Sequence, residues 1–350
     1  MGTVSITGQD RLLALSGCSY YFGPVNMQYR FFEKANIGIS EIGLGTWSMG
    51  NMWGPRNDPQ ALQTIHKAFE RGINFIDTAY AYGNGHSESL IGRAIGEHKN
   101  RDKIFVATKV PPKDHRWPAK VGSRAEEIFP GSWIREITEK SLKHLATDHI
   151  DLQQLHVWAP NWLDQGDWLN ELRKLKEEGK IRSIGISLND HEPDTALEIV
   201  PSGMIDSVQV IYNLFDQTPE ERLLTLCREH KVAVIVRVPF DEGGLTGTLT
   251  PATEFHKKDW RRYYFQGERL KETCERVKKF QSFLTNEIKS LPEFALRFCL
   301  SHPAVTTVIP GMRRPEHVEI NCAVSDGHTL PPEVLKKLKA HAWSRNFYPS

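Results

Sequence analysis

Eight short apolar runs alternate with amphipathic segments along the chain, and this alternation constrains the fold more than any other feature. Apolar runs separated by helical patterns predict βα units whose strands lie parallel in one sheet. Eight such units favour a closed (β/α)8 TIM barrel over an open doubly wound sheet, and no G-x-G-x-x-G follows an early run. The strands are predicted at 41–46, 73–77, 104–109, 150–156, 181–187, 207–212, 232–238 and 305–309.

Residue signals between the runs indicate where helices begin and end. Asp58 before Pro59 is typical of an N-cap followed by a first-turn proline, and Gly72 would end that helix. Thr218 before Pro219 repeats the pattern. Further helices are predicted at 87–98, 132–147, 166–179, 191–200, 292–302 and 314–323.

The chain adds three features to a minimal barrel. A hairpin is predicted at 27–40, before the first strand. Long loops follow the third and seventh strands, at 110–131 and 239–291, where loops of this length usually carry function or structure of their own. A helix at 331–342 and an aromatic tail at 343–348 follow the last unit.

The composition excludes several classes of partner. The 350 residues carry 44 basic and 43 acidic side chains, so the net charge of +1 gives no reason to bind nucleic acid or a membrane surface. No apolar run approaches the roughly 20 residues of a membrane span. Five scattered cysteines without metal-ligand spacing indicate reduced thiols, a cytoplasmic protein and no metal site. A homo-oligomer is compatible with this composition.

Residues 1–26 lie outside the barrel pattern, and we predict a disordered extension there, with the barrel domain spanning 27–350. The segment 15–18 (Leu-Ser-Gly-Cys) resembles a lipoprotein cleavage box. The apolar stretch at 12–15 is much shorter than the roughly 7–15 residues of a signal-peptide core, so the extension is the favoured interpretation.

Ionisable side chains stand at the ends of three consecutive predicted strands. Asp77 ends the second strand, Lys109 the third and His156 the fourth, and Tyr82 follows Asp77 by five residues. Because the carboxyl ends of parallel strands converge on one face of a barrel, these side chains are expected to share a site. A carboxylate, an amine, a phenol and an imidazole together suit proton transfer to a carbonyl oxygen.

Each of these side chains has a role in that chemistry. Lys109 would lower the pKa of Tyr82 and so make the phenol a better proton donor. Asp77 would keep Lys109 charged and oriented, and His156 would orient the carbonyl group. Each also has a structural interpretation, with Asp77 as a helix cap and Tyr80 and Tyr82 as rim aromatics. Their occurrence at three successive strand ends favours the chemical role.

Three segments resemble the signature of the aldo-keto reductase family: Ile76–Gly83, Ala107–Lys109 and Leu155–His156. The resemblance covers about 28–323 and implies a (β/α)8 barrel that binds NADPH/NADP+, with NADH possible. It also implies reduction of a small aldehyde or ketone by hydride transfer from the nicotinamide. In that family the tyrosine five residues after the aspartate is catalytic, which selects Tyr82 as the general acid.

The resemblance also implies a cofactor site. Ser187 and Gln209 match side chains that bind the nicotinamide carboxamide, and an amide suits this task because it offers a donor and an acceptor. Helix amides and arginine after the last strand suit a 2'-phosphate, which favours NADPH over NADH. The cofactor-binding residues expected are Gly45, Thr46, Trp47, Asp77, Ser187, Gln209, Pro239, Phe240, Gly243, Leu245, Gly311, Met312, Arg313, His317 and Asn321.

Some positions depart from the family pattern. Arg237 stands where an aromatic ring usually stacks on the nicotinamide. Its planar guanidinium either takes that place or points elsewhere, in which case Phe240 would line the pocket. The other departures are Leu188 inserted before Asn189, His317 in place of arginine or glutamine, and Ile320 in place of glutamate.

Aromatic residues near the strand ends predict an apolar or aromatic substrate pocket, with Trp47, Trp53 and Trp158 as its candidate walls. The favoured function is an NADPH-dependent carbonyl reductase. The alternative is a regulatory protein that binds the nicotinamide and senses its redox state with little turnover. An unrelated hydrolytic barrel is disfavoured because paired carboxylates and a metal cluster are absent from the predicted strand ends.

Overall fold

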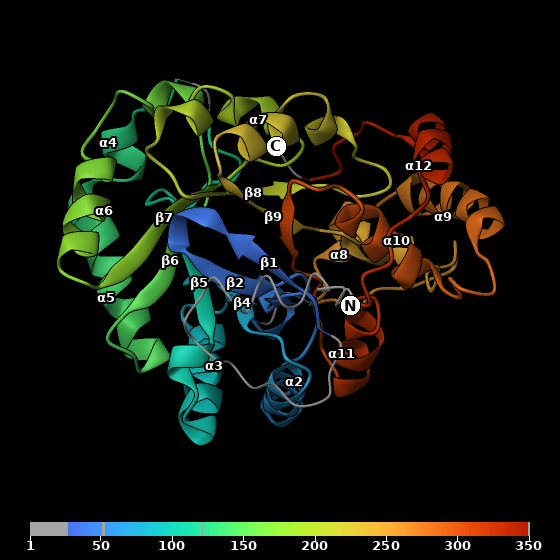
Figure 1. Ribbon diagram of the computed structural model, residues 1–350, viewed down its shortest axis with the longest axis horizontal. Helices are drawn as coiled ribbons and strands as arrows, with labels where there is room; N and C mark the ends of the chain where they lie inside the picture. Colours follow the sequence, from blue (N-terminus) through green and yellow to red (C-terminus); the bar gives the residue numbers. More distant parts are fainter. Residues whose placement is uncertain (1–26, 51–52, 121, 349–350) are drawn as a thin grey trace, which may run out of the picture.

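A computed structural model describes residues 27–50, 53–120 and 122–348, and the predicted disordered extension at 1–26 lies outside them. Eight parallel strands form one sheet in sequential order, which confirms the predicted (β/α)8 architecture (Figure 1). The strands are β3 (Leu44–Gly45), β4 (Phe75–Asp77), β5 (Phe105–Val110), β6 (Ile150–Leu155), β7 (Ile181–Ser187), β8 (Ser207–Ile211), β9 (Ala233–Arg237) and β10 (Val305–Val308).

Backbone hydrogen bonds between the first and last units close the barrel. The amide of Gly43 donates to the carbonyl oxygen of Val308 at 2.8 Å, and the amide of Val308 donates to that of Glu41 at 2.9 Å. Gly45 bridges to Gly311 in the same parallel sense. A Cβ atom at Gly45 would lie only 2.6 Å from the carbonyl oxygen of Ile309, so this close approach requires glycine.

The predicted N-terminal hairpin closes one end of the barrel. It consists of β1 (Tyr29–Phe32) and β2 (Ile37–Ser40), which pair antiparallel. Its buried side chains pack against apolar residues of the barrel strands, and this cluster is Phe32, Ile39, Phe75, Phe105, Ala107, Leu152, Ala233, Ile235 and Ile309. Burial of this apolar layer leaves the carboxyl ends of the strands as the face on which polar side chains can gather.

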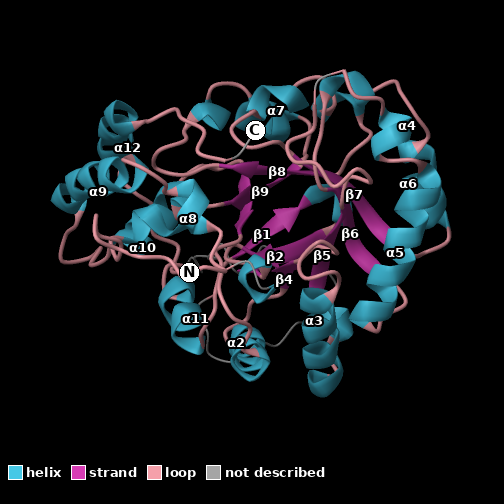
Figure 2. Ribbon diagram, turned by 180° about the vertical axis from the view of Figure 1, so that it is seen from behind, coloured by secondary structure: helices cyan, strands magenta, loops and turns pink. Residues whose placement is uncertain are grey.

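Helices surround the barrel, and no helix among the described residues is long and apolar enough to cross a bilayer (Figure 2). α8, α9, α10 and α12 gather on one side, opposite α5 and α6, in both views. The helices are α2 (Asp58–Glu70), α3 (His86–His98), α4 (Ala125–Ile128), α5 (Gly131–Leu145), α6 (Trp168–Glu177), α7 (Leu223–Glu229), α8 (Arg261–Tyr264), α9 (Arg269–Phe280), α10 (Leu291–Leu300), α11 (Pro315–Cys322) and α12 (Pro332–Leu338).

Three local expectations about the helices are wrong. Asn57, not Asp58, caps α2, because its side chain accepts a hydrogen bond from the amide of Gln60. Thr218 starts only a 3-10 turn, with its amide and hydroxyl bonded to Asp216, and α7 begins later. The helix predicted at 191–200 is replaced by the 3-10 turns η5 (Pro193–Ala196) and η6 (Val200–Ser202), since prolines divide the segment.

Arg30 of the hairpin joins β1 to α10 and β10. Its Nε donates to Glu41 at 2.9 Å, its Nη1 to the carbonyl oxygen of Val305 at 2.8 Å and its Nη2 to that of Leu300 at 2.7 Å. Glu41 is buried, so it depends on Arg30 to balance its charge.

We expect Arg30→Ala to lower the free energy of unfolding by about 3 kcal/mol, because the substitution leaves the buried Glu41 carboxylate without its cation. Arg93→Ala is the matched control, since Arg93 forms an exposed pair with Glu97 on α3 and its loss should cost less than about 0.5 kcal/mol. Urea denaturation of both variants measures the difference. Equal losses would show that Arg30 has no special structural role.

Candidate active site

A buried ion pair occupies the centre of the barrel's carboxyl face. The Nζ of Lys109 donates to both oxygens of Asp77 at 2.7 Å and to the carbonyl oxygen of Thr78 at 2.7 Å. The Lys109 side chain is 0% exposed. From the opposite side of the barrel, Nε2 of Gln209 donates to Asp77 Oδ1 at 2.7 Å. All three donor positions of the ammonium are therefore satisfied without water.

Strand register explains why these residues meet. Asp77 pairs with Ala107 on β5, and Lys109 follows two residues later on the same face of that strand. Alternate residues of each strand point into the barrel, so Asp77, Lys109, His156 and Gln209 all face inward at one end.

Tyr82 lies beside the pair on the segment that connects β4 to α3. Its hydroxyl is 3.4 Å from Lys109 Nζ, and the Nζ lies 5.1 Å from the ring centroid. Burial raises the pKa of Tyr82 well above 10, the Asp77 charge raises it further, and Arg237 opposes the rise. In this structure burial therefore outweighs any lowering of this pKa by Lys109.

His156 completes the group of four side chains. Its ring centroid is 5.8 Å from that of Tyr82, edge to face. Burial lowers the pKa of His156 well below 6.5, and the charges of Lys109 and Arg237 lower it further. The imidazole is therefore neutral near pH 7 and carries one N–H donor. Its buried Nδ1 has no hydrogen-bond partner among the described residues.

Arg237 adds a second cation to the site. Its Nη2 donates to the carbonyl oxygen of Leu188 at 2.9 Å and to Asp190 Oδ1 at 2.8 Å. Its positive charge acts on the pKa of both Tyr82 and His156, so Arg237 lies near them. The stacking of this guanidinium on a nicotinamide stays a prediction. Phe240 is only partly buried and packs against the main hydrophobic core.

The two side chains expected to bind the carboxamide lie close together. Ser187 pairs with Gln209 across β7 and β8, and both face into the barrel. One N–H of the Gln209 amide is bound to Asp77, which leaves its carbonyl oxygen as an acceptor. Asn189 is not part of this pair. Its side chain instead donates to, and accepts from, the backbone of Ala119.

The turn after β3 lies against the buried ion pair. Thr46 is buried, and its hydroxyl donates to the backbone oxygen of Asp77 at 2.9 Å. Trp47 is half-buried, with its ring centroid 6.0 Å from that of Trp53 and 5.1 Å from that of Trp260. These rings supply aromatic surface, as expected of Trp47 and Trp53. Trp158 supplies none, because it is fully buried between Trp162 and Trp168.

The residues expected at the phosphate end lie where β10 meets α11. Arg313 is half-buried and donates from Nη1 to the carbonyl oxygen of Trp53 at 2.8 Å. Burial and the nearby charge of Arg261 lower the pKa of Arg313. His317 accepts from the Arg313 amide at 3.3 Å, and Ile320 points to solvent at 52% exposure. The remaining expected residues in this region are Gly311, which is exposed, and Met312 and Asn321, which are buried.

The loop after β9 has a strained backbone and contains a residue that the sequence analysis missed. Pro239 is buried, and Gly243 and Leu245 lie in η8 (Asp241–Thr246). Glu242 precedes them at a φ of 55°, is buried, and accepts a hydrogen bond from the Tyr348 hydroxyl at 2.5 Å. Burial raises its pKa to about 8, although the bond from Tyr348 opposes this. The only sequence signal for this contact between Glu242 and Tyr348 was the aromatic tail at 343–348.

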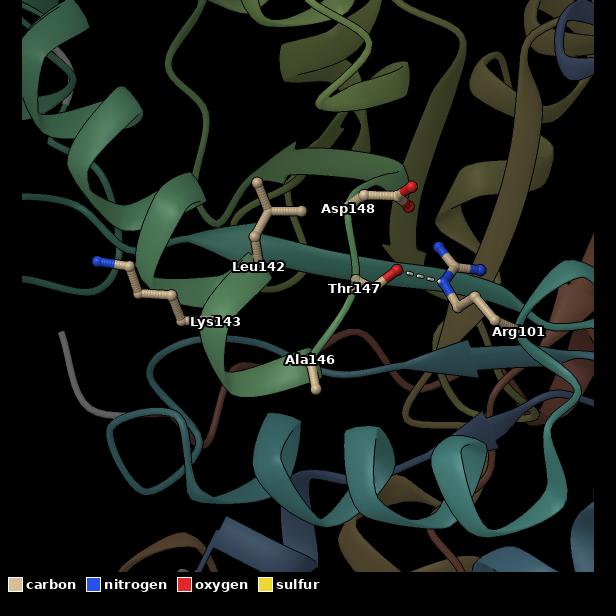
Figure 3. Close-up of a pocket in the computed structure, with 6 residues that line it drawn as sticks. All are labelled: Arg101, Leu142, Lys143, Ala146, Thr147 and Asp148. Carbon is tan, nitrogen blue, oxygen red and sulfur yellow. Dashed lines mark hydrogen bonds between the residues drawn. The ribbon is translucent and has the colours of Figure 1, made fainter.

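A surface depression lies at the opposite end of the barrel. Figure 3 shows a surface depression beside α5, where Arg101 Nε donates to Thr147 Oγ1 at 2.8 Å. Arg101 also pairs with Asp151, so its charge serves the fold. Among the described residues, no cluster of three or more His, Cys, Asp or Glu side chains could hold a metal ion.

Proteins of known family resemble this chain over most of its length. The model of the Aldo/keto reductase family matches residues 41–342. Aldo-keto reductase YhdN of Bacillus subtilis is 33% identical over 320 residues, which cover 89% of this chain and 92% of the relative. The NADH-specific methylglyoxal reductase of Escherichia coli is 33% identical over 302 residues, which cover 82% of this chain and 90% of that protein.

Two solved structures show the same similarity in three dimensions. Aldo-keto reductase AKR11C1 from Bacillus halodurans, in its holo form, superposes with a TM-score of 0.71 at 28% identity and covers 90% of this chain and 96% of its own. Glycerol dehydrogenase AKR11B4 from Gluconobacter oxydans superposes with a TM-score of 0.71 at 30% identity, covering 89% and 94%.

The buried carboxyl of Glu242 makes stability depend on pH. Its pKa is about 8 in the folded protein and ordinarily 4.5, so as pH rises from about 4.5 to about 8 the unfolded chain gains stability by ionising. Glu242→Gln cannot ionise. Relative to wild type, we expect its free energy of unfolding to rise by on the order of a few kcal/mol between about pH 5 and pH 8.

Urea denaturation across this pH range measures that difference. Glu254→Gln is the control, because it removes an exposed carboxyl and should keep the wild-type pH profile. If the free energy of unfolding changed with pH in the same way in wild type and in Glu242→Gln, the assignment of a raised pKa to Glu242 would be contradicted.

Proposed function

This chain belongs to the aldo/keto reductase family and is therefore an oxidoreductase; we propose that it reduces an aldehyde or ketone with NADPH, using Tyr82 as the proton donor. The observation that carries the proposal is the cluster of Asp77, Lys109, Tyr82 and His156 on the carboxyl face of the barrel.

The residues around this cluster fit a nicotinamide. Ser187 and the free carbonyl oxygen of Gln209 lie side by side within the barrel, where they would bind a carboxamide. The guanidinium of Arg237 is planar, is held in place by Asp190, and would lie against the ring. When bound, the nicotinamide supplies the hydride.

The protein side chains then manage the proton. As the carbonyl carbon accepts the hydride, the carbonyl oxygen becomes basic and takes the phenolic proton of Tyr82. A phenol of raised pKa stays protonated and available near neutral pH, and the alkoxide that forms is the stronger base. The positive charge of Lys109, with its Nζ 3.4 Å from the Tyr82 oxygen, would stabilise the phenolate left behind, and the neutral His156 would donate its N–H to the reacting oxygen.

Cofactor preference depends on the phosphate end. Arg313, with Arg314 and Arg261 nearby, provides positive charge beside the first turn of α11. A 2'-phosphate carries negative charge, so this arrangement supports NADPH over NADH. The E. coli relative, named as NADH-specific, shows that family membership alone does not decide this preference. We also propose a cytoplasmic location, consistent with the free thiols of Cys227, Cys274, Cys299 and Cys322.

We expect Tyr82→Phe to lower kcat by about 10²–10⁴-fold, because it removes the proton donor and little else. NADPH oxidation with a panel of aldehydes and ketones measures the effect. Tyr80→Phe is the matched control: Tyr80 stacks on His144 outside the cluster, and its variant should keep wild-type rates. Equal activity of Tyr82→Phe and wild type would overturn the assignment. Tight NADPH binding without turnover of any carbonyl would favour the redox-sensing alternative.

We expect Arg313→Ala to weaken NADPH binding by about 10- to 100-fold through loss of a charged contact to the 2'-phosphate. NADH binding should change by less than about threefold. Fluorescence titration with both nucleotides measures the dissociation constants. Arg262→Ala, which removes an exposed arginine from the neighbouring α8, is the control. Equal weakening of the two nucleotides in Arg313→Ala would rule out the phosphate contact.

A further inference from the structure

Trp117 is an exposed indole placed next to the reacting centre. It lies in the long loop after β5 and is 41% exposed. Its ring centroid is 5.8 Å from that of His156, edge to face, and Tyr82 contacts the same imidazole at 5.8 Å. Trp117 and Tyr82 therefore flank His156, and any carbonyl group bound to His156 lies within reach of the indole.

A buried clamp holds this part of the loop. The Oδ1 of Asn189 accepts from the amide of Ala119 at 3.0 Å, and its Nδ2 donates to the carbonyl oxygen of Ala119 at 3.2 Å. Asn189 is 5% exposed, and its Nδ2 is also 2.9 Å from Glu192. Because both backbone polar groups of Ala119, its N–H and its C=O, are bound by one buried side chain, the loop is fixed two residues beyond Trp117.

The segment that supplies this clamp also shapes the other wall of the site. Leu188 and Asp190, on either side of Asn189, hold the guanidinium of Arg237. A single turn after β7 thus positions a cation on one side and an indole on the other. The buried amide of Asn189 holds the loop so that the exposed Trp117 stays beside His156. A loop that only connected β5 to α5 would not need this arrangement.

The charges of the site indicate what Trp117 would contact. Lys109 is paired with Asp77, and Arg237 with Asp190, so neither cation lacks a counter-ion for a charged substrate. With both cations paired, the indole of Trp117 is part of the exposed surface that a substrate at this site can contact. Aromatic rings gain stabilisation when they stack on apolar or aromatic groups.

We propose that Trp117 is a specificity-determining residue that packs against an aromatic group of the carbonyl substrate, and that Asn189 is the positioning residue that holds it there. This inference rests on the proposed carbonyl reductase function and adds the substrate class to it. The selectivity resides in a loop contact, separate from the proton-transfer residues.

The test compares two aldehydes that differ in the group beside the carbonyl: benzaldehyde and propanal. We expect Trp117→Ala to raise KM for benzaldehyde about 10-fold while KM for propanal changes less than about twofold. In both cases kcat should change less than about threefold. Trp117→Phe, which keeps an aromatic ring, should restore most of the affinity. Phe31→Ala is the control, since Phe31 is an exposed aromatic side chain on the hairpin at the other end of the barrel.

Asn189 is tested with the same pair of substrates. Asn189→Ala should raise KM for benzaldehyde more than for propanal, whereas a general loss of structure would affect both equally. Asn189→Asp keeps the acceptor for the Ala119 amide but loses the donor, so it should fall between Asn189→Ala and wild type. Circular dichroism melting curves confirm that each variant is folded.

The outcomes separate the inference from the function on which it rests. Equal KM changes for both aldehydes in Trp117→Ala, or no change in either, would overturn the role of Trp117 while leaving carbonyl reduction intact. Wild-type protein that reduces neither aldehyde nor any other carbonyl would overturn the proposed function, and the inference with it.

Discussion

The hydrogen-bonded pair of Lys109 and Asp77 is the interaction on which the site depends. A fully buried ammonium is stable only when a carboxylate and further acceptors replace its lost hydration, and here Asp77 and the carbonyl oxygen of Thr78 do so. Gln209 extends the network to β8, so one carboxylate links strands from opposite sides of the barrel. Removal of either charge would leave the other buried without a partner. Tyr82 packs against Lys109 and His156 packs against Tyr82, so the pair supports the position of both rings.

The pair also determines the charges of its neighbours. Burial, and after it the negative charge of Asp77, raises the pKa of Tyr82, so the phenol keeps its proton. The cations Lys109 and Arg237, together with burial, keep His156 neutral. Arg237 has its own counter-ion in Asp190. The site therefore presents neutral hydrogen-bond donors backed by compensated charges, which suits a substrate that is neutral at first and gains negative charge on its oxygen as it reacts.

Local patterns in the sequence were sufficient for the barrel and for the four clustered residues. Short apolar runs identify the strands, and the carboxyl ends of parallel strands converge on one face of a barrel. The sequence alone therefore predicts that Asp77, Lys109 and His156 lie close together. Side-chain partners far along the chain could not be predicted this way. Asn189 binds Ala119, 70 residues away, and the pKa of Tyr82 reflects burial that no motif records. Even the cap of α2 was displaced by one residue, because asparagine and aspartate serve equally well there.

The loop after β9 shows how such distant contacts produce a defined shape. Val238, Asp241 and Glu242 all have positive φ angles, which cost non-glycine residues about 1–2 kcal/mol each. Arg345 donates to both oxygens of Asp241 at 2.6 Å, and Tyr348 donates to Glu242. These bonds stabilise a backbone that the loop sequence would not adopt by itself. The conformation of the loop that carries the expected cofactor-binding residues Gly243 and Leu245 is therefore set by residues about 100 positions away in the C-terminal tail, so the barrel and its tail must fold together before the site is complete.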